Sequence, residues 1–466
     1  MGQTENLFPE FAVRMREAGL NDAAIRAFKH SYETLIGGQT GLIPEESIQP
    51  VSDLPRLDQL ASQITPDPAL LSQTVVIKLN GGLGTGMGLE RAKSLLPVKD
   101  GLTFLDFIAK QILYLRQKHG VPLRFLLMNS FSTSRDTLDF LRKYPQLGEP
   151  QTLELMQNQV PKVDAKTLRP IAWPENPQLE WCPPGHGDLY PSLLGSGWLA
   201  RLLAEGVKYL FVSNSDNLGA TLDLNLLSYF AESGQPFLME VADRTASDRK
   251  GGHLARSKDK LLLRESAQCP ESDLTAFQDI ERHRFFNTNS LWVRLDHLKE
   301  RLDAHGGFIP LPMIKNTKTV DVRKKDSPVV FQLETAMGAA IECFENAGAI
   351  VVPRARFAPV KTTSDLLALR SDAYRVAGDC RVVLASSAGQ PPAIDLDANH
   401  YKLVEQLDEK VADGVPSLKD CRELTVRGPI GFNSGNIFRG KIILTNKSPE
   451  PRALPPGEYR DCSIEV

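Results

Sequence analysis

The sequence predicts an α/β protein whose central sheet is mostly parallel and covered by helices on both faces, followed by a β-rich C-terminal domain. Two observations support the sheet: several apolar runs have the length of buried strands, and stretches with helical spacing separate them. A third observation is the change near residue 376, after which short β-rich runs lie between Gly, Pro and Asn turns. The buried strands are expected at 74–78, 124–129, 208–214 and 236–241.

The N-terminal segment, residues 1–70, is predicted to be helical at first and irregular afterwards. Asn21 is placed to cap a helix that begins at Asp22, and Gly37 and Gly38 are placed to end it. Prolines and acidic residues between positions 43 and 53 indicate a linker. We expect this segment to pack on the main domain, and the sequence assigns it no chemistry.

The main domain is expected to span residues 71–376. In sheets of this kind, ligands bind at the carboxyl ends of the strands. A glycine-rich loop, Asn129, Asp216 and the segment after Val241 all follow predicted strands, so we expect the ligand site there. The helices between the strands are predicted at 104–115, 134–143 and 222–232.

The C-terminal domain is expected to span residues 377–466 and to be all-β. Its runs at 381–384 and 441–444 are typical of short strands, and little helical periodicity is visible. Regularly spaced short strands suit a small β-solenoid as well as a sandwich, so the sequence leaves both open.

The composition is that of an ordinary globular protein and does not indicate nucleic acid or a membrane as a partner. The 466 residues are 42% hydrophobic with a net charge of −3, and no apolar run approaches the roughly 18 residues of a membrane helix. The first residues lack a signal-peptide pattern, and Asn6 stands where a myristoylation motif needs Ser or Thr. Six scattered cysteines form no Cys-x-x-Cys pair, so we expect no disulfide framework, no zinc site and a cytoplasmic location.

The most informative stretch runs from residue 79 to 93. It follows a predicted strand, has five glycines between positions 81 and 88, and ends at Lys93. Glycines let backbone N–H groups approach an anion, so this order indicates phosphate binding. The Walker A and dinucleotide fingerprints both fail, because no Gly directly precedes Lys93, and Met87 or Leu89 stands where G-x-G-x-x-G needs its last Gly. The alternative, a flexible turn, has little need for five glycines.

Two polar clusters are candidates for the same site. Asp216 lies in the polar stretch after the third strand, and Mg²⁺ favours one or two carboxylates together with phosphate oxygens. An equal alternative is that Asp216 or Asn217 caps the following helix. His186 lies between two glycines in a Pro-Pro-Gly-His-Gly-Asp turn, which favours close approach of a ligand, and the alternative is a structural histidine.

Three further stretches suit a phosphorylated sugar. Lys250 beside paired glycines repeats the phosphate pattern, and Asn287 and Asn289 are predicted on one face of a strand, where amides suit sugar hydroxyls. Lys361 lies in a proline-framed basic loop before a helix that Thr363 or Ser364 is placed to cap. No Ser-His-Asp or Cys-His pattern is visible, so catalysis by positioning and charge neutralisation is expected.

Seven motifs together resemble the eukaryotic-type UTP–glucose-1-phosphate uridylyltransferase (UDP-glucose pyrophosphorylase) family. They occur in the family's order between about residues 70 and 376, and the turns at 128–134 and 155–162 resemble those of the protozoan members. The motifs are the stretches 79–94, 183–188, 213–220, 250–252, 286–289, 332–336 and 359–361.

The resemblance implies a fold and a reaction. The fold is a Rossmann-like nucleotidyltransferase domain followed by a left-handed parallel β-helix. The reaction is UTP + glucose 1-phosphate ⇌ UDP-glucose + pyrophosphate, by direct in-line attack of the sugar phosphate on the α-phosphorus, with Mg²⁺ and without a covalent enzyme intermediate. UTP, glucose 1-phosphate, UDP-glucose and pyrophosphate are therefore the expected ligands.

The resemblance also implies roles for individual residues. Lys93 is expected to neutralise the triphosphate, Asp216 to hold the metal, and Lys361 to stabilise the developing charge. The nucleotide side comprises the backbone of Leu79, Gly81 and Gly82, the uracil readers Gln157 and Gly185, and His186 near the phosphates. The sugar-phosphate side comprises Asn214, Lys250, Gly251, Glu265, Asn287 and Asn289.

Two positions depart from the family pattern, and two other functions stay open. Ala92 stands where proline often precedes the lysine, which predicts a less rigidly held Lys93, and Ser290 replaces a usual second Asn on the sugar side.

The alternative functions are a UDP-sugar pyrophosphorylase of broader sugar choice and a catalytically inactive relative that binds UDP-sugar. Both a monomer and a homo-oligomer built through the C-terminal domain are compatible with the sequence.

Overall fold

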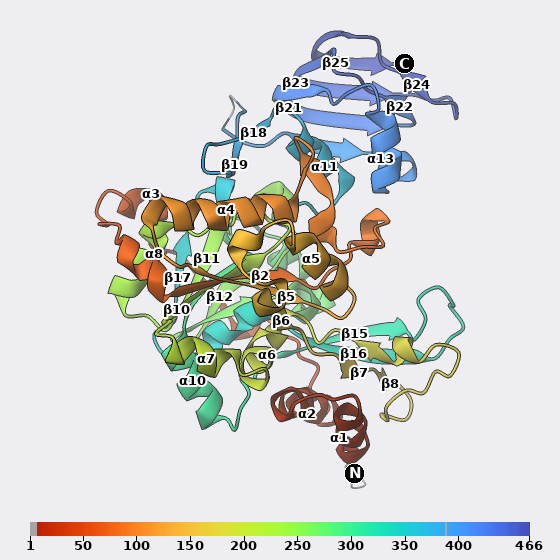
Figure 1. Cartoon of the computed structure of the whole chain (residues 1–466). Coiled ribbons are helices and arrows are strands. Elements are labelled where there is room, and N and C mark those ends of the chain that lie inside the picture. The colour runs from red at the N-terminus through yellow and green to blue at the C-terminus, as the bar shows by residue number, and fades with distance from the viewer. Residues whose placement is uncertain (1–6, 387–388) are drawn as a thin grey trace.

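The computed structural model describes residues 7–386 and 389–466, and a ten-stranded mixed sheet forms its centre (Figure 1). Four neighbouring strands of this sheet are parallel, in the order β10-β2-β5-β6. They confirm three of the predicted strands and lie at β2 (Thr74–Asn80), β5 (Arg124–Asn129), β6 (Glu154–Met156) and β10 (Tyr209–Asn214).

One antiparallel strand interrupts the parallel order. β14 (Phe285–Arg294) lies between β10 and β11 (Phe237–Asp243) and is antiparallel to both. Two reversals restore the direction, so β11 points the same way as β10, and β17 (Gly348–Val351) pairs in parallel with it. The carboxyl ends of β2, β5, β10 and β11 therefore share one edge, as the sequence predicted.

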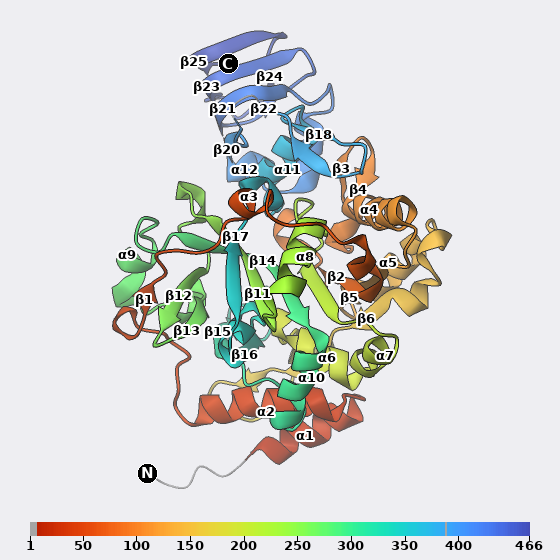
Figure 2. The same ribbon diagram turned by 90° about the vertical axis from the view of Figure 1, so that its left-hand side faces the viewer.

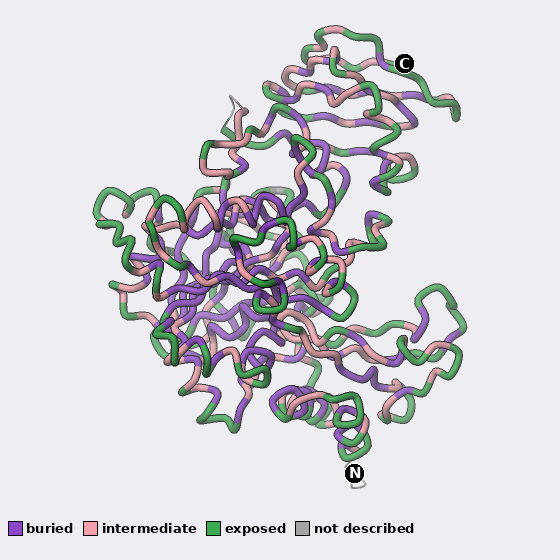
Figure 3. Tube along the Cα trace, in the orientation of Figure 1, coloured by how far each residue is buried: buried purple, intermediate pink, exposed green. Residues whose placement is uncertain are grey.

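Two layers of helices cover the sheet, and Figure 3 shows the strands buried between them. Strand side chains alternate between faces, so Val76 packs in one apolar cluster while Val75 and Ile77 pack in the other. The first cluster contains residues of α4 (Phe104–His119), α5 (Ser134–Leu141) and α8 (Leu224–Ser233). The second contains residues of α6 (Leu189–Gly195), α7 (Trp198–Ala204) and α10 (Leu295–Ala304).

The N-terminal helices form a separate apolar cluster on one side of the main domain. The Asn21 side chain accepts the Ala24 N–H at 3.0 Å and caps α2 (Asp22–Ile36), as predicted, and Gly37 ends this helix. With α1 (Phe8–Glu17), α2 packs on two small sheets. These sheets contain β7 (Val160–Pro161) with β9 (Trp181–Cys182), and β8 (Val163–Asp164) with β15 (Met313–Thr319) and β16 (Val329–Thr335).

The predicted linker at 43–53 is bound to the main sheet rather than free. Its strand β1 (Gln49–Pro50) pairs antiparallel with β12 (His253–Ser257), and β12 forms a hairpin with β13 (Lys260–Arg264). Figure 2 shows this segment running from the N-terminal helices past β12 towards α3 (Leu57–Leu60). The prolines and acidic residues of this segment do not reveal its attachment to the sheet, because that attachment depends on backbone pairing with a distant strand.

Parallel strands also form the C-terminal region. This stacking favours the solenoid over the sandwich and is consistent with a β-helix, whose handedness stays a prediction. The strands are β20 (Ala393–Leu396), β21 (Ser417–Arg427), β23 (Asn436–Thr445) and β25 (Gly457–Glu465), with β22 (Ile430–Gly431) beside β24 (Arg452–Ala453). The all-β expectation was wrong in part, because two short helices, α12 (Ala398–Tyr401) and α13 (Val404–Lys410), pack beside them.

The C-terminal strands share one apolar cluster with the first face of the main sheet. We keep 1–70, 71–376 and 377–466 as proposed domain boundaries.

Among the described residues, no helix is both long and apolar enough to cross a membrane. Asn6, on which the expectation about myristoylation rests, lies outside the described residues. Shorter elements are β3 (Pro97–Lys99), β4 (Leu102–Thr103), α9 (Leu274–Phe277), α11 (Thr363–Arg370), β18 (Tyr374–Val376) and β19 (Val382–Leu384).

Candidate active site

The glycine-rich loop turns over the carboxyl edge of the sheet directly after β2. A Cβ on Gly81 would lie 2.6 Å from Gln157 Oε1, so a larger residue here would displace the Gln157 amide. The Ser130 hydroxyl donates to the Gly81 carbonyl at 2.8 Å, and the Lys93 N–H donates to the Gly82 carbonyl at 3.2 Å. The loop is therefore closed on itself, with its far end brought back to its start.

The expected uracil readers lie beside this loop. Gln157 Nε2 donates to the Gly185 carbonyl at 3.0 Å, and the Gln157 N–H donates to the Asn129 carbonyl at 2.7 Å. Gly185 has φ +78°, and a Cβ there would lie 2.4 Å from the Thr335 carbonyl oxygen. The structure thus brings Gly81, Gln157 and Gly185 together, although they are far apart in the sequence.

A buried polar network supports these readers from behind, and the sequence did not predict it. The Asp188 carboxylate accepts the Asn158 N–H and the Ser192 hydroxyl, each at 2.7 Å. Burial raises the pKa of Asp188 to about 6, against the effect of these hydrogen bonds. Asp188 is the last residue of the 183–188 motif and Asn158 lies in the 155–162 turn, but nothing in the sequence indicates that they pair.

His186 has a defined protonation state. Its Nδ1 accepts the Met337 N–H at 2.9 Å, which leaves Nε2 to carry the ring proton. Burial lowers the pKa of His186 to about 4, so the ring is neutral at physiological pH. A neutral imidazole here can donate a hydrogen bond to a phosphate but adds no charge.

Lys93 and Asp216 form an ion pair at the carboxyl edge. Lys93 Nζ lies 2.7 Å from Asp216 Oδ2 and also donates to the Val360 carbonyl. The sequence predicted a loosely held Lys93 because Ala92 replaces proline, but these two tertiary contacts hold its ammonium instead. Asp216 Oδ1 is buried without a hydrogen-bond partner. Such an oxygen is available to a ligand.

The helix-cap alternative for Asp216 and Asn217 is wrong. Asp223 caps α8, its Oδ1 accepting the N–H groups of Asn225 and Leu226 at 2.9 and 3.1 Å. The Asn217 side chain instead holds the segment before Lys361. Its Oδ1 accepts the Ala358 N–H at 3.0 Å, and its Nδ2 donates to the Arg356 carbonyl at 3.2 Å.

The segment that carries Lys361 is anchored at several points. The Val360 N–H donates to the Asp216 carbonyl at 3.1 Å. Deeper in the sheet, Arg356 Nε lies 2.8 Å from Glu240 Oε2, and Trp292 Nε1 donates to the same carboxylate at 2.9 Å. Because Glu240 and Arg356 are both buried, loss of either member of this ion pair would cost about 3–5 kcal/mol. This ion pair therefore fixes where the segment leaves the sheet.

The Lys361 side chain is exposed beyond these anchors. Its backbone N–H donates to Asp365 Oδ2 at 2.8 Å. The helix cap of α11 is Thr362, one residue before the predicted Thr363 or Ser364, and Asp365 completes a capping box with it. The backbone of Lys361 is therefore held in place, while its side chain is exposed to solvent.

Several expected sugar-side residues also come together. A Cβ on Gly252 would lie 2.5 Å from Glu265 Oε2, and one on Gly251 would overlap the Phe286 ring at 2.0 Å. Burial raises the pKa of Glu265, while a hydrogen bond from Asn287 and the charge of Lys361 act in the opposite direction. Glu265, Asn287 and Lys361 are therefore close enough to interact.

Asn287 and Asn289 meet by a different route from the one predicted. The pairing register of β14 with β11 shifts between Ser290 and Asn287, and Asn289 has φ +57°. Strand alternation therefore does not place the two amides. Asn287 Nδ2 donates to Asn289 Oδ1 at 3.1 Å, and the Asn289 N–H donates to Asn287 Oδ1 at 2.9 Å. The β-bulge makes them a single hydrogen-bonded pair.

The remaining expected residues lie on the same edge or on the turn beside it. Asn214 ends β10 opposite Leu79 of β2, and both are partly exposed. Lys250 is exposed on a turn that Arg244 holds, because Arg244 Nη2 donates to the carbonyls of Asp248 and Arg249 at 3.2 and 2.9 Å. The sequence did not assign Arg244 a role.

Lys78 was also missed. It is buried in β2 beneath the polar turn and donates to Ser213 Oγ at 2.7 Å. Burial lowers its pKa to about 7. In the sequence, the one indication that Lys78 is buried is its position inside an apolar run.

The donor set at this edge suits a magnesium ion that is held mainly by substrate. Within residues 7–386 and 389–466, no three His, Cys, Asp or Glu side chains gather as metal ligands. Asp216 Oδ1, however, is a buried carboxylate oxygen without a hydrogen-bond partner, and Oδ2 of the same carboxylate contacts Lys93 at the end of the glycine-rich loop. Mg²⁺ is commonly bound by one or two carboxylates with phosphate oxygens and water completing the shell, so the residues fit.

The fold and the site together define a nucleotidyltransferase. A glycine loop, a lysine–aspartate pair and a second lysine occupy the carboxyl edge of a mostly parallel sheet, beside amides and a carboxylate suited to a sugar. The family model described as UTP–glucose-1-phosphate uridylyltransferase matches residues 25–439. The chain belongs to this family.

Individual relatives agree with that assignment. The UTP–glucose-1-phosphate uridylyltransferase of Solanum tuberosum is 40% identical over 453 residues, which cover 94% of this chain and 92% of the relative. The solved structure of a Leishmania major UDP-glucose pyrophosphorylase mutant in complex with UDP-glucose is 51% identical, with a TM-score of 0.96 and full coverage of both chains. A Trypanosoma brucei structure is 48% identical over 99% of this chain and all of the other, with a TM-score of 0.91. These identities agree with the predicted likeness to protozoan members.

Proposed function

We propose that this chain catalyses UTP + glucose 1-phosphate ⇌ UDP-glucose + pyrophosphate. The observation that carries the proposal is the meeting of Lys93, Asp216 and the Val360–Lys361 segment between the glycine loop and the sugar-side residues. Catalysis of phosphoryl and nucleotidyl transfer depends mainly on positioning and charge neutralisation, and this arrangement supplies both. The UDP-glucose bound in the Leishmania relative supports the choice of ligand.

The reaction needs no nucleophile from the chain. An oxygen of the sugar phosphate forms a bond to the α-phosphorus of UTP, the bond from that phosphorus to the bridging oxygen breaks, and pyrophosphate leaves. Lys93 neutralises the triphosphate from its position beside Asp216. Lys361, whose ammonium is exposed on a fixed backbone, stabilises the charge that develops on the α-phosphate.

Asp216 is the proposed magnesium ligand, through its unpartnered Oδ1. When bound, the ion would neutralise phosphate charge and orient the oxygens that it touches. Lys93 shares the carboxylate of Asp216 through Oδ2. The ion pair therefore occupies Oδ2 of the carboxylate and leaves Oδ1 for the metal.

The two substrates are read by different groups in this proposal. Gln157 and the Gly185 backbone read uracil, while the backbone of Leu79, Gly81 and Gly82 contacts the nucleotide, with His186 near the phosphates. On the other side, polar side chains and one turn bind glucose 1-phosphate. These are Asn214, Lys250, Gly251, Glu265, Asn287 and Asn289.

One assay separates this function from both alternatives. Purified protein with UTP and Mg²⁺ is given glucose, galactose or N-acetylglucosamine 1-phosphate, and pyrophosphate release is measured. We expect the highest kcat/KM with glucose 1-phosphate. A preference for either other sugar would favour the broader pyrophosphorylase, and binding of UDP-glucose without turnover would show an inactive relative.

Location and assembly are part of the same proposal. We infer a cytoplasmic enzyme, since the cysteine pattern suits a reducing compartment. A monomer and a homo-oligomer through the C-terminal strands predict different masses in sedimentation, and removal of residues 377–466 from an oligomer would be expected to dissociate it.

A further inference from the structure

The segment at residues 43–50, here called the strap, contacts the sugar side of the site from outside the sheet. Its strand pairs with β12, and buried Ile48 packs with Ala255 and Leu262 of the hairpin. The open end of that hairpin pairs His253 with Arg264. The next residues beyond the pair are Gly252, which follows the sugar-side residue Gly251, and Glu265, which the proposed function places at the glucose 1-phosphate side.

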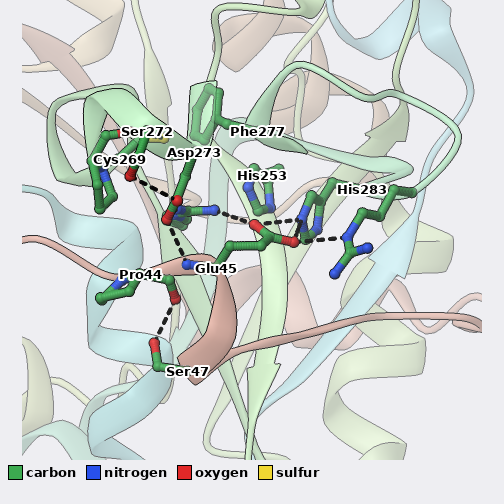
Figure 4. A network of polar contacts seen from close by, with 12 residues as sticks. Pro44, Glu45, Ser47, His253, Cys269, Ser272, Asp273, Phe277 and His283 are labelled. Atoms are coloured by element: carbon green, nitrogen blue, oxygen red, sulfur yellow. Dashed lines mark hydrogen bonds and ion pairs between the residues drawn. The ribbon is translucent and has the colours of Figure 1, made fainter. Parts of the chain in front are cut away.

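Glu45 of the strap is the centre of a partly buried ionic cluster (Figure 4). Its carboxylate accepts Arg264 Nη1 at 2.6 Å and Arg282 Nε at 2.7 Å, and it lies 3.0 Å from His283 Nε2. The Glu45 N–H donates to Asp273 Oδ2 at 2.7 Å. Arg264 and His283 have no exposed side-chain surface, so Glu45 satisfies charges and donors that water does not reach.

The strap holds Glu265 on both sides along the chain. On one side, Glu45 binds Arg264, the residue before it. On the other, the Ile43 N–H donates to the Gln268 carbonyl at 2.7 Å, and Gln268 Oε1 accepts the Glu265 N–H at 2.9 Å. Because neighbouring side chains at a strand end point to opposite sides, the position of Arg264 limits where Glu265 can point.

The cluster also reaches the second sugar-side element. His253 and His283 stack with ring centroids 3.9 Å apart, and Arg264 lies over Phe277 at 5.6 Å. His253 pairs in register with Phe286, which directly precedes Asn287. The Asn287 N–H in turn donates to the Gly252 carbonyl at 3.1 Å. One cluster therefore supports Gly252, Glu265 and Asn287 together.

We propose that Glu45 is a positioning residue for glucose 1-phosphate, acting through Arg264 on Glu265. This inference rests on the proposed function. It assigns a role in substrate binding to the N-terminal strap, which contributes no group to the substrates itself. Among the described residues, Glu45 makes its hydrogen bonds and ion pairs with Arg264, Asp273, Arg282 and His283, none of which belongs to the nucleotide side, so UTP binding should be independent of it.

The test compares Glu45→Gln with wild type and with Glu46→Gln, an exposed neighbour on the same strap. For Glu45→Gln we expect the KM for glucose 1-phosphate to rise about tenfold, with the KM for UTP within twofold and a smaller kcat/KM preference for glucose over galactose 1-phosphate. Glu46→Gln should match wild type in all three. Glu45→Asp, which keeps the charge on a shorter side chain, should lie between.

A structural role alone predicts a different result. Equal changes in both KM values, or no change in folded Glu45→Gln, would overturn the proposal. If Glu45→Gln does not fold, Glu45→Asp serves as the test. Its KM for glucose 1-phosphate should rise while its KM for UTP stays unchanged, with the melting temperature measured alongside. A wild-type enzyme without uridylyl transfer would overturn the proposed function itself, before any variant is compared.

Discussion

The proposed nucleotide side and the proposed sugar side of the site are built in different ways. The nucleotide side uses backbone groups of glycine loops at the ends of parallel strands, where Gly81 and Gly185 allow close approach. The sugar side uses side chains on an antiparallel hairpin and a bulged strand, and a buried ionic cluster holds them. Backbone recognition depends on glycine at a few fixed positions, whereas side-chain recognition on the sugar side depends on a cluster that includes the distant N-terminal strap.

The largest effect is expected where the two sides meet, at Asp216. Asp216→Ala should lower kcat by about 10³-fold or more, because it removes the ligand for an ion that supplies several kcal/mol of charge stabilisation. Steady-state rates across a Mg²⁺ titration measure this. Asp216→Asn keeps the shape and an acceptor for Lys93, so equal loss in both variants assigns the effect to the carboxylate. An active but less stable Asp216→Ala protein would point to a structural role instead.

Lys361→Ala should lower kcat by about 10²-fold or more, because its charge acts on the transition state. The KM values of both substrates should change little, since the backbone anchors at Val360 and Asp365 remain. Lys361→Arg should recover part of the rate. Unchanged kcat in the alanine variant would show that this lysine does not take part.

Gly185→Ala tests whether the nucleotide side depends on backbone. A Cβ at φ +78° that also meets the Thr335 carbonyl should cost about 1–3 kcal/mol, or roughly 5- to 100-fold in the KM for UTP. The KM for glucose 1-phosphate should stay the same. Gly197→Ala is the matched control, because Gly197 has φ +79° but open space around it. A similar loss in both would assign the effect to strain alone.

Glu265→Gln tests the sugar side, where the KM for glucose 1-phosphate is expected to change and the KM for UTP is not. Loss of a charged acceptor should raise the KM for glucose 1-phosphate about tenfold and leave the KM for UTP unchanged. Combined with Glu45→Gln, the double variant should be little worse than Glu265→Gln alone, because one residue acts through the other. Additive effects would show that the strap acts elsewhere.

The smallest effect concerns pH and the nucleotide side. The pKa of His186 is about 4 in the folded protein, below its ordinary value near 6.5, so the unfolded chain takes up the proton first as pH falls. Stability that is present above pH 6.5 is therefore lost between about pH 6.5 and 4. His186→Asn keeps an acceptor for Met337 and should lose about one to a few degrees less Tm than wild type between pH 7 and 5. Equal pH slopes in thermal melts would contradict this.

Much of the nucleotide side was visible in the sequence. The run of glycines after the first predicted strand pointed to the loop, and strands such as 124–129 and 208–214 were recognised from apolar runs alone. The sugar side was less accessible. Asn287 and Asn289 were identified, but their contact depends on a bulge that a strand pattern does not reveal. Asp188, Arg244 and Lys78 were missed because their roles exist only through partners that are far away in the chain.

The sequence by itself determined the main buried strands, the glycine-rich loop and the likeness to a uridylyltransferase family, because these are local patterns of residue type and spacing. Only the tertiary structure decided how Lys93 is held, which residues cap α8 and α11, and what the strap does. Those features are contacts between residues separated by tens to hundreds of positions. Local sequence carries no information about such distances, and folding alone brings Glu45 to Arg264 or Asp216 to Lys93.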